Sequence, residues 1–146
     1  MHTRESFLKE LTSAKARDAA ARLLDVAQES GASIGWGSSG LSIRTRCSLW
    51  PYPVSVAWLF PPSKLGFLNL KLISFGAAIF GYDPPPGEKL RLFLEQWVGQ
   101  FSTDDYCEDV SGLGAKAWSV DYDVAAQHID LLGDRLSKVL LELKSL

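Results

Sequence analysis

Cysteine and histidine are scarce in this sequence, which has two of each in 146 residues. Cys47 and Cys107 lie sixty positions apart, without a CxxC pair and without a histidine at ligand spacing. Structural zinc sites and disulfide-stapled domains need several such residues at short, regular spacing. We therefore expect no metal, no other cofactor and no disulfide, with reduced thiols in a bacterial-type cytoplasm.

The sequence also has little excess charge and no long apolar run. Its 15 basic and 17 acidic residues leave a net charge of -2, which argues against a protein whose main role is to wrap nucleic acid. The most apolar stretch, residues 67–80, has 14 residues and contains Asn69 and Lys71, whereas a membrane span needs about 20. The first residues form no continuous apolar segment of the signal-peptide type. We expect a cytoplasmic protein without a membrane partner.

Acidic residues are absent between positions 32 and 82. A metal-dependent nuclease would need two carboxylates on neighbouring strands and a lysine after the second. The nearest match, residues 69–71, offers only an asparagine and Lys71. His128 falls inside an expected helix, and no GxSxG-type elbow supplies a nucleophile for it. We therefore predict no catalytic residues and regard an enzyme as less consistent with the sequence than a binding protein.

What the sequence contains is the composition of an ordinary globular protein, with 47% hydrophobic and 22% charged residues. The length suits a single domain covering residues 1–146, and no repeat or linker divides it. Apolar residues at helical spacing predict a first long helix that starts after Thr12 and ends near Gly31. The same spacing predicts helices after Gly87 and after Asp123, the last one reaching almost to the end of the chain.

Between the first two helices, polar and apolar residues alternate with a period of two, which is typical of strands. The loop between the third and fourth of these strands is too short for a parallel crossover, so they should pair antiparallel. Both carry apolar residues on both faces, and each face therefore needs a cover. The expected strands are residues 32–37, 41–46, 54–60 and 67–80, with a further short one near residues 115–120.

The order of these elements predicts an α+β fold, with an antiparallel sheet of about four strands preceded by one long helix and followed by two helices packed on the sheet. The stretch Ile34, Gly35, Trp36 and Gly37 opens the predicted hairpin. With this stretch and this order of elements, the chain resembles small bacterial α+β domains of unknown function over most of its length. The resemblance implies no activity and no catalytic residues.

One predicted strand places two cations on the same face of the sheet. Arg44 and Arg46 are two residues apart, and Lys71 on a nearby strand can join them in a concentrated positive patch. The simpler alternative is that such arginines only solubilise the surface or protect a sheet edge. Among the five tryptophans, Trp50 stands in a proline-containing loop, where we expect a binding surface.

Two functions follow as expectations. The first is a non-catalytic interaction module that binds itself or a protein partner through an apolar sheet face, as a symmetric homodimer formed by the third and fourth strands. The rival to the homodimer is that the first helix covers that face within one chain. The alternative function is a binding domain for an anionic ligand, a nucleic acid or a nucleotide, centred on Arg44, Arg46 and Lys71.

Overall fold

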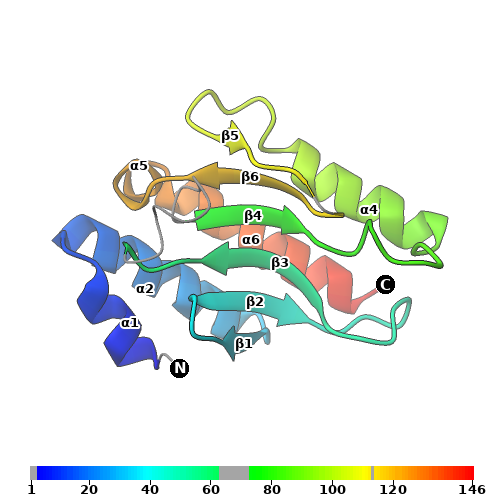
Figure 1. Ribbon diagram of the computed structural model, residues 1–146, viewed down its shortest axis with the longest axis horizontal. Coiled ribbons are helices and arrows are strands. Elements are labelled where there is room, and N and C mark those ends of the chain that lie inside the picture. The colour runs from blue at the N-terminus through cyan, green and yellow to red at the C-terminus, as the bar shows by residue number, and fades with distance from the viewer. Residues whose placement is uncertain (1–2, 63–72, 113) are drawn as a thin grey trace.

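The computed structural model describes residues 3–62, 73–112 and 114–146, which form a layer of helices on an antiparallel sheet (Figure 1). The described helices are α1 (Arg4–Glu10), α2 (Ala14–Glu29), α4 (Glu88–Gly99), α5 (Tyr122–Gln127) and α6 (Ile129–Lys144). The described strands are β1 (Ser33–Trp36), β2 (Leu41–Thr45), β3 (Val54–Leu59), β4 (Ile73–Ala77), β5 (Glu108–Asp109) and β6 (Lys116–Val120).

The strands lie in the order β1-β2-β3-β4-β6-β5, and all neighbours are antiparallel. The predicted antiparallel pairing of the third and fourth strands is confirmed by β3 and β4, where Ala57 is opposite Phe75. Residues 67–72 of the predicted fourth strand lie outside the described residues. The predicted short strand near residues 115–120 is confirmed as β6, which pairs with β4.

The α+β class and the antiparallel sheet are confirmed, whereas the order of elements and the number of strands differ from the prediction. In the chain, α4 comes between β4 and the strands β5 and β6, so the sheet has six described strands rather than about four. β6 pairs along the edge of β4, while β5 consists of Glu108 and Asp109, which give no strand pattern. The predicted last helix is divided at His128, where φ is -123° and the backbone leaves the helical region.

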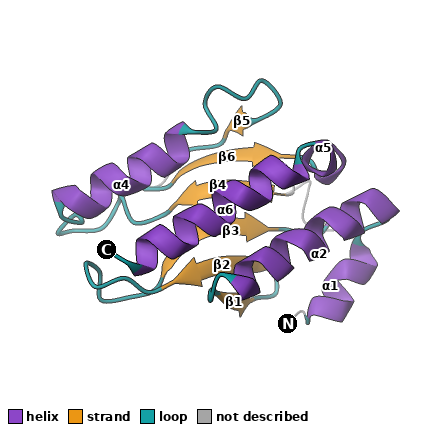
Figure 2. Cartoon of the chain, turned by 180° about the vertical axis from the view of Figure 1, so that it is seen from behind, coloured by secondary structure: helices purple, strands orange, loops and turns teal. Residues whose placement is uncertain are grey.

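All described helices lie on the same face of the sheet, as Figures 1 and 2 show from opposite sides. α2 runs beside α5 and α6 and not on the far face of the sheet. The alternative in which the first helix covers the second face is therefore wrong. The buried stripe of α2 is rich in alanine, including Ala16, Ala20 and Ala27, and these small side chains let it lie close to the neighbouring helices.

The hydrophobic core lies between the sheet and the helices. Phe75 of β4 stacks on Phe101 with ring centroids 4.8 Å apart, and Trp97 of α4 meets both rings edge-on. Offset-stacked and edge-on rings are favourable beyond the area they bury. These three rings therefore fix how α4 sits on β4 and β6.

Two further features concern the thiols and the membrane. Cys47 and Cys107 are both free thiols, and both are buried. In the described part of the chain, no helix combines the length and the apolar character that crossing a bilayer requires.

A β-bulge in β3 decides which of its side chains face away from the helices. The register with β2 shifts by one residue, so that Val56 is an extra residue in β3. Val56 and Ala57 are both fully buried on the helix side, and Ser55 and Trp58 point to the other side. The third strand is therefore less apolar on its outer side than expected, because the bulge turns two consecutive apolar residues toward the helices and leaves Trp58 beside Ser55 on the other side.

Candidate functional site

We call the sheet face that is turned away from the described helices the outer face. Directly paired residues of neighbouring strands point to the same side of a sheet, so the register identifies which side chains belong there. They are mostly small or polar around a single tryptophan, in place of the apolar surface expected from the sequence. The outer face contains Ser33, Gly35, Ser42, Arg44, Ser55, Trp58, Ser74, Gly76, Ala117, Ser119 and, on the edge strand β5, Glu108.

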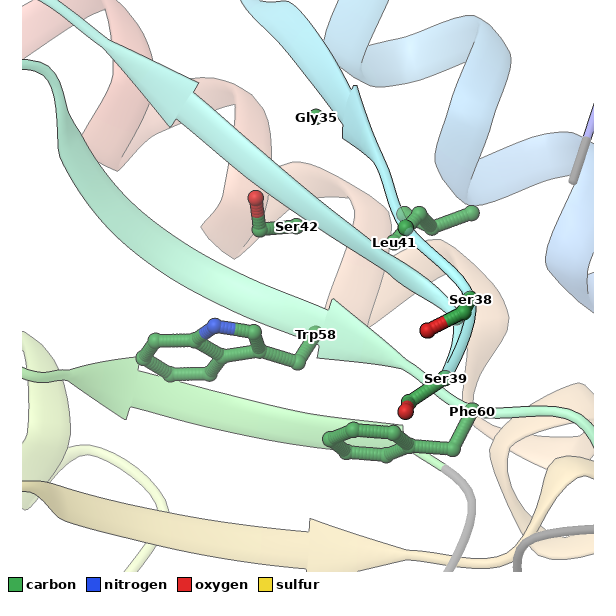
Figure 3. Close-up of a pocket in the computed structure, with 9 residues that line it drawn as sticks. Gly35, Ser38, Ser39, Leu41, Ser42, Trp58 and Phe60 are labelled. Carbon is green, nitrogen blue, oxygen red and sulfur yellow. The ribbon is translucent and has the colours of Figure 1, made fainter. Parts of the chain in front are cut away.

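A shallow depression of about 360 Å³ opens beside the end of β3 (Figure 3). Its walls are the turn between β1 and β2 and the aromatic residues Trp58 and Phe60. Figure 3 shows the two rings along the end of β3, with the hydroxyls of Ser38 and Ser39 at the turn beside them. The volume is at the lower end of the range that small-molecule sites occupy.

The turn is held in place by glycine. Gly37 N donates to Gly40 O at 2.8 Å and closes the turn. Gly40 has a φ of +132°, and a β-carbon there would overlap the carbonyl oxygen of Leu59. Only glycine combines this conformation with such a close approach. The turn is therefore pressed against the end of β3, beside Trp58 and Phe60.

Arg44 adjoins this depression through Gly35. Its guanidinium lies against the backbone of Gly35 on β1, where any β-carbon would overlap it, and Gly35 lines the depression. The guanidinium has no hydrogen-bond or ion-pair partner among the described residues. Most other arginines are paired: Arg4 with Asp25, Arg22 with Asp130, Arg91 with Glu95, Arg135 with Asp104, and Arg17 with the carbonyl of Leu11.

The charge around Arg44 is not compensated within its part of the sheet. The segment from position 32 to position 82, which includes β1 to β4, contains no acidic residue. Glu108 and Asp109 of β5 lie four strands from β2, or about 19 Å at a spacing of about 4.8 Å per strand. Salt at physiological concentration screens exposed charges beyond about 8 Å. This part of the outer face is therefore locally positive although the whole chain is not.

The other predicted site residues are not brought to the depression. Arg46 is exposed and lies just past the end of β2, on the side away from the turn. Trp50 lies before the start of β3, at the opposite end of that strand, and its ring meets Tyr82 edge-on with centroids 5.3 Å apart. Lys71 lies outside the described residues. Of the predicted patch, the structure thus places only Arg44 beside the depression.

Sequence reasoning missed three residues that shape this surface. The sequence pattern places Trp58 and Phe60 on an apolar strand and Gly35 in the predicted hairpin, and it marks none of them as a site residue. The available signal was the combination of a lone glycine in a strand, an arginine on the adjacent strand, and a long segment without carboxylates. None of these features alone predicts a site.

A second polar cluster lies between the loop before β5 and the helices. Tyr106 stacks on His128 with ring centroids 3.9 Å apart, and Arg135 donates to the carboxylate of Asp104 at 2.5 Å. Burial raises the pKa of the Tyr106 phenol, and the charge of Asp104 adds to this effect. The described residues contain no group of three or more potential metal ligands. The contacts tie the loop to α6, which is a packing role.

No protein-family model, curated protein or solved structure matches this chain. The outer face, with an unpaired arginine beside an aromatic depression, is therefore the feature from which a function is inferred.

Proposed function

We propose that the chain is a non-catalytic binding module that holds an anionic ligand on the outer face of its sheet. The observation that carries this proposal is the guanidinium of Arg44, which lies against Gly35 beside the depression and has no partner among the described residues. A guanidinium presents five donors in a rigid fork that suits phosphate or carboxylate. An arginine left unpaired in an acid-free part of the sheet is ready to accept such a group.

The turn between β1 and β2 supports the same ligand chemistry. Ser38 and Ser39 are exposed at the depression, and their hydroxyls and backbone amides can donate to anion oxygens. Hydrogen bonds to charged groups are each worth about 1.5–3 kcal/mol. One guanidinium with one or two such donors therefore gives an anion several charged hydrogen bonds at this place.

Self-association through the sheet was the other expected function, and its premise was an apolar face. On the described part of that face, serines surround Trp58 and Arg44. A polar surface of this kind favours an anionic ligand over a second copy of the chain. Partner binding through the outer face would also have to leave the Arg44 charge unpaired or supply a carboxylate for it.

Titration with inorganic pyrophosphate at low ionic strength, followed by backbone amide chemical shifts, tests the proposal. We expect shifts centred on Gly35, Ser38, Ser39 and Ser42. Arg44→Gln should weaken binding about tenfold or more, because one charged hydrogen-bond donor set is lost. The matched control is Arg46→Gln, which removes an equal charge two residues away from an exposed position.

A second variant separates position from charge. Gly35→Ala keeps the arginine but forces its guanidinium to shift from this place, so pyrophosphate binding should fall, by less than in Arg44→Gln. Equal losses in Arg46→Gln and Arg44→Gln would mean that pyrophosphate responds to general charge, and the proposed site would be abandoned. The proposed site would also be abandoned if the amide chemical shift changes cluster away from the β1–β2 hairpin.

A further inference from the structure

Trp58 gives the depression a flat apolar wall beside the Arg44 charge. It is the direct cross-strand neighbour of Ser42, it is half-buried on a paired strand, and Phe60 continues the wall. Among the described rings, Trp58 and Trp118 take part in no ring pair, whereas the other three tryptophans do. Trp36 pairs with Phe7, Trp50 with Tyr82, and Trp97 with Phe75. With no ring partner among the described residues, the indole of Trp58 can stack on a planar group of a ligand.

The charge and the ring are spaced for one compact ligand. The guanidinium of Arg44 lies against Gly35. Gly35 is two strands from Trp58 in the same cross-strand row, with Ser42 between them. At about 4.8 Å per strand the separation is about 10 Å. A nucleotide has its phosphate and its planar base at opposite ends of a sugar, over a similar length. The serine hydroxyl between the two ends can donate to or accept from that sugar.

From this spacing, and resting on the anion site proposed above, we propose that the ligand is a nucleotide unit, either free or within a single-stranded nucleic acid. The phosphate binds Arg44 and the turn, and the base stacks on Trp58. The depression has room for one unit, about 360 Å³. Bases within a duplex are not available for such stacking, so double-stranded nucleic acid is not the ligand.

The test compares a complete nucleotide with its two halves. Adenosine 5′-monophosphate, ribose 5-phosphate and adenosine are titrated into the full chain at low salt. We expect the complete nucleotide to bind about tenfold or more tightly than either half, because base stacking and phosphate binding then act together. A series of oligothymidylates of increasing length distinguishes the two sources of the nucleotide. Affinity that grows with length identifies a strand, and affinity independent of length identifies a free nucleotide.

Variants assign each half to its residue. Trp58→Leu should reduce the affinity for adenosine 5′-monophosphate to that for ribose 5-phosphate, while Trp58→Phe should retain part of the difference. Arg44→Gln should reduce the affinity for adenosine 5′-monophosphate to that for adenosine. The matched control is Trp118→Leu, because Trp118 is also half-buried in the sheet but lies on its helix side, opposite Phe75 on the neighbouring strand. Its nucleotide binding should be unchanged.

The outcomes separate this inference from the anion site. If ribose 5-phosphate binds as tightly as the nucleotide, the nucleotide inference fails and the anion site stands. The same follows if folded Trp58→Phe protein binds adenosine 5′-monophosphate as tightly as the unsubstituted protein and as the Trp58→Leu variant. If neither phosphate compound binds, both fail. If Trp58→Leu unfolds, the comparison between Trp58→Phe and the unsubstituted protein decides: equal affinities for adenosine 5′-monophosphate contradict the nucleotide inference.

Discussion

Two serine hydroxyls of the outer face are buried without a hydrogen-bond partner. Ser74 and Ser119 are directly opposite each other on β4 and β6, with exposed fractions of 4% and 0%, and neither hydroxyl has a partner among the residues that the structure describes. A buried polar group that is left unsatisfied costs about 1–3 kcal/mol. Ser119→Ala should therefore raise the free energy of unfolding by about 1 kcal/mol, measured by urea denaturation.

Ser55→Ala is the control, because Ser55 lies on the same face and is partly exposed. This substitution should change stability by no more than about 0.5 kcal/mol. A loss of 1 kcal/mol or more in Ser119→Ala would show that its hydroxyl has a partner in solution, and the reasoning about this pair would be wrong.

At the scale of single residues, the alternation of β2 predicted the place of Arg44 and not its surroundings. Polar and apolar residues alternate in β2, and the side that Arg44 takes follows from them directly. The close fit of its guanidinium on Gly35 depends on the register between two strands, which no local pattern specifies. The side that Trp58 takes depends on a bulge at Val56 and Ala57, and a run of apolar residues gives no sign of it.

At the scale of elements, Tyr122 joins α5 to the end of β3. Its hydroxyl donates to Phe60 O at 3.2 Å, and burial raises the pKa of the phenol above its ordinary value of 10.0. The folded protein thus keeps this proton at a pH where the unfolded chain loses it. The contribution of the protonated Tyr122 phenol to the free energy of unfolding is complete below pH 10. It is lost as pH rises beyond 10, at up to about 1.4 kcal/mol per pH unit.

Tyr122→Phe should reduce this alkaline loss of stability, measured as the free energy of unfolding between pH 9 and pH 11. The slope should not vanish, because burial also raises the pKa of Tyr106. At neutral pH the variant should be about 1 kcal/mol less stable, since one buried hydrogen bond is removed. Tyr82→Phe serves as control because Tyr82 is 52% exposed. An unchanged slope in Tyr122→Phe would contradict the assignment.

The elements with regular patterns were predictable, and the irregular ones were not. The spacing of Leu90, Leu94 and Trp97 predicts the buried face of α4, and all three are buried. β5 is only two acidic residues long, and it is a strand because its backbone pairs with the edge of β6. The division of the last helix at His128 occurs without glycine or proline, so the chain itself carries no signal for it.

At the scale of the whole molecule, charge is unevenly distributed along the chain. All 17 acidic residues lie outside positions 32–82, so the carboxylates belong to the helices, to β5 and to the later loops. Four of the five arginines outside this segment pair with carboxylates that lie outside it as well, and Arg17 donates to Leu11 O. The net charge of -2 therefore does not describe this part of the sheet, which is positive. Total charge alone would have argued against an anion site there.

The arrangement of helices on one face bears on the state of association. A stable monomer seldom leaves a large apolar surface exposed, and the outer face would need a second copy if it were apolar. Its described residues are mainly serines around Trp58 and Arg44, so that need is small. We expect sedimentation at about 20–50 µM to give the mass of a monomer. Two copies facing each other about a two-fold axis would also bring their Arg44 charges to the same interface, where like charges repel. A dimer that Trp58→Arg dissociates, and that adenosine 5′-monophosphate also dissociates, would show instead that the outer face is a surface for self-association.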